Sequence, residues 1–285
     1  MEEKIASEFH DAYTETTPNK LETLWNEYAP KTLIKFFPAT YEQDGTNYFL
    51  EHLKNKSLWL SSPKKFNDPF DCTFNYNYKE YISQIVPPFF AQIFCLPNIC
   101  ANAQTTQLQN KLNQAYEDFN KEMLRICHKL EDSMFVSCFA EKDNIYSSRM
   151  WGHYALNHTG ACAEYDWTTV KDASPFGCIP IKYTDQYEYY PIPSNTREGT
   201  KNFLKFYTKS KEWSYEKEWR ISHQIELNQD GFLISFKSPI KVYLGCKASS
   251  KLINDVKQLC LNNNIELYQM ITKPNSFCLS YQKID

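Results

Sequence analysis

Residues 241–271 read KVYLGCKASSKLINDVKQLCLNNNIELYQMI, and this stretch indicates the fold class most directly. Its opening residues, KVYLGC, form an apolar run that predicts a strand, and its closing residues, IELYQMI, predict a second one. Between them, apolar residues recur every three to four positions, as on one face of a helix: Leu252, Val256 and Leu259. Ser249 or Ser250 would supply the helix N-cap. The tail therefore predicts a strand–helix–strand unit, to which residues 277–284 add a further strand.

The same alternation of short apolar runs and helical patterns continues upstream. We expect strands at 33–37, 57–61, 72–78, 134–139, 161–165, 178–183, 213–223 and 231–236, and helices at 48–56, 149–157 and 202–209. Elements in this order predict an α+β fold with a mixed, largely antiparallel central sheet and flanking helices.

Two segments differ from this pattern. Residues 1–30 are polar and predict an N-terminal lead-in with a short helix around 20–28. Residues 79–132 predict a helical insertion, because apolar side chains follow a helical rhythm through its second half: Leu108, Leu112, Tyr116, Phe119, Met123, Ile126 and Leu130. We expect the remainder, residues 31–285 with this insertion, to form a single α+β domain.

Composition excludes several classes of protein. The 285 residues carry 31 Lys and Arg against 34 Asp and Glu, so no overall charge draws the chain to nucleic acid or an acidic membrane. The 7 glycines show neither dinucleotide-fingerprint nor P-loop spacing. The 10 cysteines include no CxxC pair and no HExxH is present, so we expect no metal site. The polar start and the lack of an apolar run of about 18 residues predict a cytoplasmic protein without a membrane partner.

The first of three candidate site segments is the loop SSPKKFNDPFD at 61–71. Pro69 favours a turn because it disfavours a helical backbone at the preceding residue, and Phe66 and Phe70 can anchor that turn to the core. The polar side chains that the turn then presents are Asn67, Asp68 and Asp71. Alternatively, these side chains only cap their own backbone amides.

The second segment is RMWGHYA at 149–155, which we expect on a short helix. His153 and Tyr154 would lie together on one face and Trp151 on another. These rings could form a stacking wall for a nucleotide or a nicotinamide ring. Alternatively, they are ordinary packing residues of the core.

The third segment is WSYEKEWRI at 213–221. As a strand it would place Glu216, Glu218 and Arg220 on one face. Neighbouring carboxylates repel each other, so the pKa of one of them would rise, and Arg220 would relieve the repulsion. Such a row suits a site where positive charge develops in a transition state. The alternative is a solvated edge strand with surface ion pairs.

In this order and spacing, the segments resemble a bacterial family of unknown function, domain-of-unknown-function family 2971. The matching pieces are Lys35-Phe36-Phe37, Ser61 to Asp71, Cys138-Phe139, Met150 to Ala155, Lys209 to Arg220 and Leu244-Gly245. They span about residues 33–271, and FNDPFD and WxYExEWR are the most specific of them. Phe37 stands where the family usually has Arg. The family name carries no activity.

A weaker similarity in layout points to ADP-ribosyltransferases, including their DNA-modifying toxin branch. In that group a glutamate on a late strand bonds the nicotinamide ribose of NAD and stabilises the oxocarbenium-like centre that forms as nicotinamide leaves. The resemblance implies this role for Glu218, and for Glu216 the role of orienting or deprotonating the acceptor. It also implies that NAD is contacted by Lys35, Ser61, Asn67, Asp71, Trp151, His153, Tyr154 and Arg220, with Trp151 or Tyr154 stacked on nicotinamide.

The resemblance thus implies an NAD-consuming transferase or glycohydrolase that modifies nucleic acid or protein in a toxin or phage-defence setting, with a controlling inhibitory partner protein. Two other functions stay open. A metal-dependent nuclease would hold a divalent cation with Asp68, Asp71, Glu216 and Glu218. A non-catalytic module would recognise a nucleotide or a partner in an acidic, aromatic cleft.

Overall fold

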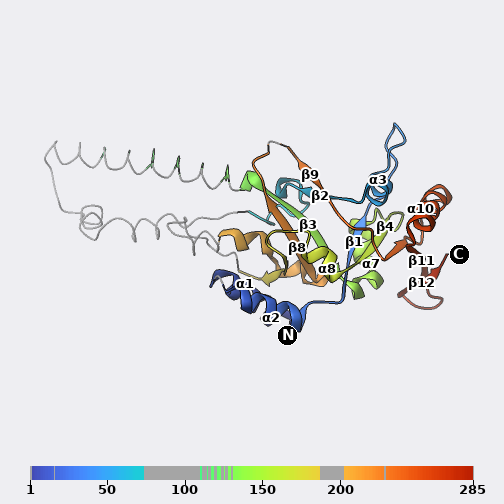
Figure 1. Cartoon of the computed structure of the whole chain (residues 1–285), viewed down its shortest axis with the longest axis horizontal. Helices are drawn as coiled ribbons and strands as arrows, with labels where there is room; N and C mark the ends of the chain where they lie inside the picture. The colour runs from blue at the N-terminus through green and yellow to red at the C-terminus, as the bar shows by residue number, and fades with distance from the viewer. Residues whose placement is uncertain are drawn as a thin grey trace.

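The computed structural model of the chain combines helices and strands as predicted (Figure 1). It describes residues 2–15, 17–73, 131–186, 202–227 and 229–284, together with scattered residues between 110 and 129. Within these residues, the strands form one large sheet and a separate two-stranded sheet. The α+β class is therefore confirmed.

The large sheet is mostly antiparallel, as predicted. Its strands are β1 (Thr32–Phe37), β2 (Ser57–Ser61), β3 (Met134–Glu141), β4 (Ala161–Asp166), β5 (Cys178–Pro180), β8 (Glu218–Gln224), β9 (Gly231–Ser235), β10 (Lys241–Leu244), β11 (Glu266–Thr272) and β12 (Leu279–Lys283). The main path runs β12-β11-β10-β4-β1-β3-β2-β9, and β8 pairs with β3 and β5. Among the described residues, β10–β11 is its one parallel pair. Strands β6 (Lys182–Thr184) and β7 (Thr208–Ser210) form the small parallel sheet.

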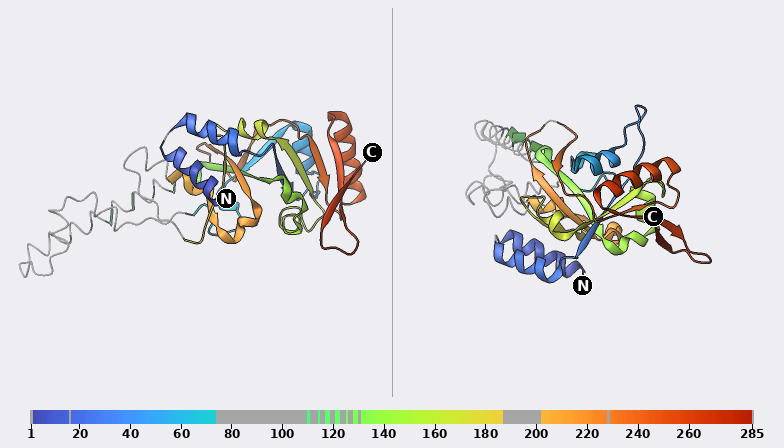
Figure 2. Two further views of the ribbon diagram at one scale, coloured as in Figure 1. Left: turned by 90° about the horizontal axis from the view of Figure 1, so that it is seen from below. Right: turned by 45° about the vertical axis from the view of Figure 1, so that its right-hand side comes forward.

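Helices flank this sheet. They are α1 (Glu2–Thr14), α2 (Pro18–Tyr28), α3 (Tyr48–Asn55), α7 (Ser148–Tyr154), α8 (Trp167–Lys171) and α10 (Ser250–Asn263), with short 3-10 helices η1 (Pro63–Lys65), η2 (Lys142–Tyr146), η3 (Lys205–Tyr207) and η4 (Lys211–Glu216). The cap of α10 is Ser249, whose Oγ accepts the Leu252 amide at 3.2 Å. Figure 2 shows α1 and α2 (blue) toward one end of the fold and α10 (red) toward the other.

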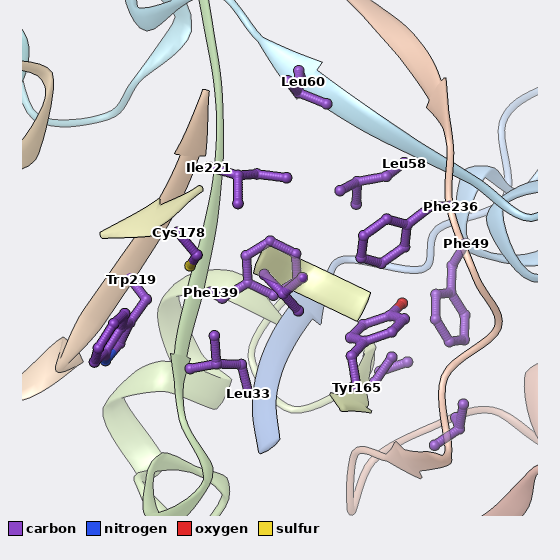
Figure 3. Close-up of a cluster of buried hydrophobic side chains, with 14 of the residues drawn as sticks. Leu33, Phe49, Leu58, Leu60, Phe139, Tyr165, Cys178, Trp219, Ile221 and Phe236 are labelled. Atoms are coloured by element: carbon purple, nitrogen blue, oxygen red, sulfur yellow. The ribbon is translucent and has the colours of Figure 1, made fainter. Parts of the chain in front are cut away.

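The core lies between the sheet and the helices that cover it. Figure 3 shows buried side chains from separate strands meeting in its centre, among them Leu33, Phe139 and Tyr165. Phe139 and Tyr165 pack edge to face with ring centroids 6.0 Å apart. Because these residues come from β1, β3 and β4, this packing holds the middle of the sheet together.

The N-terminal residues contain two helices, whereas the sequence predicted one short helix around 20–28. Phe9 of α1 is fully buried, and its ring meets the edge of Trp219 at 5.8 Å. Ala6 and Ala12 on the same helix are also buried. Polar composition concealed this helix, because only a narrow stripe of small and apolar side chains faces the core.

The sheet forks between β1 and β3. These two strands pair only at Leu33↔Glu141 and Ile34↔Ala140. Beyond that point β1 continues along β4, and β3 continues along β8. On its other side β3 meets β2 only at Ser61↔Val136. The fork leaves room for side chains from β1, β2, β3 and β8 to line one hollow, which is the candidate site described below.

Two segments differ from their predictions beside this fork. Residues 202–209 are predicted to be helical, but the chain becomes strand β7 at Thr208. Residues 213–223 are predicted to be one strand, but the chain stays in η4 up to Glu216. The left-handed backbone of Lys217, at φ 45°, then redirects it into β8. Asn144 fixes this turn, because its side-chain amide donates to the carbonyls of Tyr215 and Glu216. This tertiary contact outweighs the alternating side-chain pattern that predicted a strand.

The predicted insertion at 79–132 is described only in part. The described residues between 110 and 129 are helical and exposed, and the apolar positions of the predicted rhythm lie outside the described residues. Residues 74–78 of the strand predicted at 72–78 also lie outside them. In the part of the chain that the structure describes, no helix has the length and apolarity needed to cross a bilayer.

We predict that Phe9→Ala lowers the free energy of unfolding by about 3–5 kcal/mol, because it leaves a cavity against Trp219. Lys4→Ala on the exposed side of α1 serves as the matched control, with a change within about 0.5 kcal/mol. Urea denaturation monitored by circular dichroism measures both values. An unchanged midpoint for Phe9→Ala would show that α1 lies outside the cooperative core.

Candidate active-site cleft

A cleft of about 590 Å³ opens where the sheet forks. Its walls come from β1, β2, β3, α7 and the loop after β2, and its floor comes from the end of that loop, β7, η4 and β8. The predicted site residues that line it are Lys35, Ser61, Asn67, Asp71, His153, Tyr154, Glu216, Glu218 and Arg220. Residues from four separate segments of the sequence are thus brought to one hollow.

Trp151 is the predicted site residue that the structure does not place in the cleft. Its side chain is fully buried, and its Nε1 donates to the Ile145 carbonyl at 2.8 Å. Its ring packs edge-on against Phe36 at 5.3 Å. The structure therefore places Trp151 in the core, and of the two rings predicted to stack on nicotinamide, Tyr154 is the one that lines the cleft. On the same helix, half-buried Tyr154 and exposed His153 form the cleft wall.

The loop at 61–71 combines both roles considered for it. Asp68 caps its own turn, because its Oδ1 accepts the Phe70 amide at 2.9 Å. Asp71 instead points into the protein and holds Arg220. Phe66 packs over the guanidinium of Arg220 at 5.3 Å, whereas Phe70 is exposed and does not anchor the loop as predicted. The contacts of Phe66 and Asp71 with the buried Arg220 therefore fix the loop.

Arg220 joins two carboxylates at the floor of the cleft. Its Nη1 and Nη2 donate to the two oxygens of Asp71 at 2.9 and 2.6 Å. Its Nε and Nη2 donate to the two oxygens of Glu218 at 2.5 and 3.1 Å. A further bond goes from Nη1 to the Phe206 carbonyl at 2.7 Å. The guanidinium is wholly buried, and its planar fork matches both carboxylates.

Lys209 is the second cation of the floor, and our sequence analysis gave it no role. Its Nζ lies 2.6 Å from Glu216 Oε2, 3.2 Å from Glu218 Oε2 and 3.7 Å from Asp71 Oδ2. The only signal in the sequence was its place at the start of the family motif that ends at Arg220. The floor thus contains three carboxylates around two buried cations.

Glu216 lies at this floor although it is not part of a strand. It ends η4, and the turn at Lys217 brings its carboxylate alongside that of Glu218. Tyr154 donates its hydroxyl to Glu216 Oε1 at 2.5 Å, which connects the cleft wall to the floor. The prediction that Glu216 and Glu218 face the same way therefore holds, although the local structure differs.

The environment moves the pKa values of these two glutamates in opposite directions. Burial, together with the charge of Glu218, raises the pKa of Glu216 despite the nearby Lys209. Burial alone would also raise the pKa of Glu218, but the charges of Arg220 and Lys209 outweigh it and lower that pKa strongly. Glu218 is thus held ionised, while Glu216 is the carboxyl group best able to exchange a proton.

Lys35, in the second half of β1, is a third cation of the cleft. Its Nζ donates to the Cys138 carbonyl at 3.1 Å and lies 5.5 Å from the centre of the Phe139 ring. No carboxylate of the described residues lies within ion-pair distance of it. Burial lowers the pKa of Lys35, partly opposed by Cys138 and Glu218. It is the cleft cation whose charge a ligand could balance.

The carboxylates do not form a metal-binding group. In the described part of the chain, no three His, Cys, Asp or Glu side chains are arranged to hold a metal ion. The Lys209 ammonium lies among the three carboxylates, where a divalent cation would have to lie. Asp68, the fourth ligand of the nuclease hypothesis, is turned to its own loop. The geometry gives no support to a metal-dependent nuclease.

Part of the chain matches a family model that has no assigned activity. Residues 150–221, about a quarter of the chain, match the family model described as "Protein of unknown function (DUF2971)". This match includes most of α7, Lys209 and the Glu216–Arg220 segment, and it confirms the predicted resemblance to this family. Neither a curated protein nor a solved structure matched the chain.

We predict that Glu218→Gln lowers the stability of the protein at pH 7 by about 3–5 kcal/mol, because Arg220 and Lys209 lose a buried partner. The pKa of Glu218 is lowered from its usual 4.5, so an unfolded chain takes up its proton first as the pH falls. The ion-pair contribution is therefore present above pH 4.5 and disappears as the pH falls toward the lowered pKa.

Urea unfolding at pH 7 and at several values below pH 4.5 measures this dependence. The unaltered protein should lose stability steeply on the acid side, and Glu218→Gln should lose less. Glu212→Gln, an exposed glutamate on η4, is the control and should follow the unaltered protein. An acid limb equally steep in Glu218→Gln would contradict this assignment.

Proposed function

We propose that this cleft binds NAD, releases nicotinamide and transfers the ADP-ribosyl group to a nucleic acid, a protein or water. The bond between ribose C1′ and the nicotinamide nitrogen breaks, and nicotinamide leaves with the electron pair of that bond. An acceptor oxygen or nitrogen bonds to C1′ as that bond breaks and gives its proton to Glu216. The observation that carries the proposal is the pair Glu216 and Glu218, whose pKa values are moved apart at the floor of one cleft.

Glu218 suits the role of the fixed negative charge. Its lowered pKa keeps it ionised, and Arg220 and Lys209 hold both of its oxygens in place. The floor has three carboxylates and two cations, so one negative charge remains when Glu216 is ionised. A preorganised negative charge of this kind stabilises an oxocarbenium-like transition state more than a neutral substrate.

Glu216 suits the role of the general base. A base that works near neutral pH needs a pKa above that of an ordinary carboxyl group, and burial supplies this shift. The hydroxyl of Tyr154 holds its Oε1, which fixes the direction from which a proton arrives. Aromatic side chains of the walls, Phe36, Phe66 and Tyr154 among them, offer flat apolar surface to the nicotinamide ring.

The setting we propose is a cytoplasmic toxin or phage-defence effector, because depletion of NAD would harm the cell that contains it. An inhibitory partner protein that covers the cleft would restrain such an enzyme. These parts of the proposal follow from the activity and stand or fall with it.

A second candidate function is a non-catalytic module that binds a nucleotide. The observation that favours it is the complete pairing of Glu218, whose two oxygens are both engaged by Arg220. A carboxylate bound in this way has less potential to offer a substrate than an unpaired one. Binding of NAD without release of nicotinamide would distinguish this function from the enzyme.

We predict that the purified chain releases free nicotinamide from NAD and that Glu216→Gln slows this release at least about 100-fold, since it removes the general base. The variant should stay folded, because the raised pKa shows that a neutral group is tolerated at this position. In the unaltered protein the rate should rise with pH as Glu216 loses its proton. Chromatography of nicotinamide over a pH series measures both effects.

The controls separate chemistry from stability. Glu212→Gln should release nicotinamide at the unaltered rate, and Glu218→Gln should lose release when assayed at a temperature where its circular dichroism spectrum is native. Equal release by Glu216→Gln and the unaltered protein would rule out Glu216 as the base. Absence of release from any protein, with NAD still bound, would favour the binding module.

A further inference from the structure

A second hollow, of about 490 Å³, lies beside the cleft and is called here the His52 pocket. It is lined by α3, by the end of β1 and by β2 and β9. The residues that it shares with the cleft are Lys35, Phe37, Pro38 and Trp59. The two hollows therefore meet along the second half of β1, and Lys35 lies at their junction.

The lining of the His52 pocket is mainly apolar and aromatic. Phe37 and Phe49 pack with ring centroids 4.9 Å apart in its wall. Trp59 and Leu233, paired across β2 and β9, stand at its mouth and are 46% and 60% exposed. Apolar side chains left exposed around a concave surface are typical of a ligand or partner site rather than of ordinary surface.

His52 lines this pocket as an uncharged imidazole ring at neutral pH. Its Nδ1 is bonded to the Ser57 carbonyl and its Nε2 to the Tyr165 hydroxyl. Burial lowers the pKa of His52 to about 4, and Lys35 adds to this effect. Both ring nitrogens are thus occupied within the protein, and the imidazole contributes a flat face rather than a charge.

Charge complementarity indicates the chemistry of the occupant. The ammonium of Lys35 makes one hydrogen bond, to a backbone carbonyl, and has no carboxylate partner among the described residues. An anionic group at the junction would gain charge-assisted hydrogen bonds from the remaining donors of Lys35. A flat aromatic group attached to that anion would then lie in the His52 pocket, between the rings of its walls.

We propose that the His52 pocket binds the purine base of a nucleotide whose diphosphate contacts Lys35. The proposal deepens the proposed function and rests on it for the other end of the ligand, because the ribose beyond the diphosphate would then reach Glu218. Recognition of the base itself needs no reaction, so it can be tested without turnover.

The test uses ADP, which carries the base and the diphosphate but has no nicotinamide bond to break. Calorimetric titration of the full chain with ADP should show saturable binding, and Glu212→Gln, at an exposed glutamate outside both hollows, should bind with the same affinity. Leu233→Glu, at the exposed mouth, should weaken ADP binding at least about tenfold, since it removes apolar contact from the pocket that receives the base and sets a charged group there. Leu261→Glu is the matched control, because Leu261 is 67% exposed on α10 and does not line the pocket.

Lys35→Gln separates the two parts of the ligand. It should weaken binding of ADP about tenfold while leaving the weaker binding of adenosine unchanged, because adenosine has no phosphate. Loss of ADP and adenosine binding alike would overturn the role given to Lys35, and unchanged ADP binding in Leu233→Glu would overturn the pocket assignment. A Leu233→Glu variant that only converts a dimer to a monomer would overturn it as well, since the pocket would then be a subunit contact.

These outcomes are distinguishable from failure of the proposed function. ADP binding that depends on Leu233, without nicotinamide release from NAD, would retain the pocket and reject the enzyme. Nicotinamide release with an unchanged KM for NAD in Leu233→Glu would retain the enzyme and reject the pocket.

Discussion

The buried guanidinium of Arg220 determines the arrangement of the whole site. It comes from the centre of the fold on β8 and holds Asp71 on one side and Glu218 on the other. Through Asp71 it fixes the loop after β2, and through Glu218 it fixes the start of its own strand. A charge removed from water in this way is costly unless each of its donors is matched, which explains why so many polar groups converge on it. Lys209 then joins the carboxylates that Arg220 gathers.

Such a cluster is a weak explanation for stability by itself. Buried ion pairs often contribute no more than well-packed apolar residues of similar volume. What the cluster does provide is a fixed geometry and two glutamates that differ in protonation although they are separated by a single residue. Carboxyl groups with separated pKa values are frequent in active sites, and they also occur in structural networks. The position of this cluster at the floor of an open cleft favours the functional interpretation.

Much of the fold was predictable from the sequence, because strands with strong alternation and a well-capped helix such as α10 carry their own local signals. The site was also largely predictable, since Glu218 and Arg220 lie two residues apart on a strand and must share a face. Trp151 shows where this reasoning ends: the motif that contains it does not tell which ring enters the core. Lys209 could not be given a role because no local pattern reveals which distant carboxylates a lysine will meet. Glu216 was placed correctly, although its segment was assigned to the wrong local structure. The turn after it depends on Asn144, which is distant in the sequence, so no neighbouring residue predicts it.

The narrow contact between β1 and β3 has a consequence for how the protein transmits force. Among the described residues, β1 is the strand that joins the β4–β10–β11–β12 half of the sheet to the β3–β8 half, and it pairs with β3 at two residue pairs only. Continuity between the halves therefore depends mainly on side-chain packing rather than on a ladder of backbone hydrogen bonds. A molecule bound across the fork would contact both halves and hold them together. Binding in the cleft would therefore make the whole sheet more rigid.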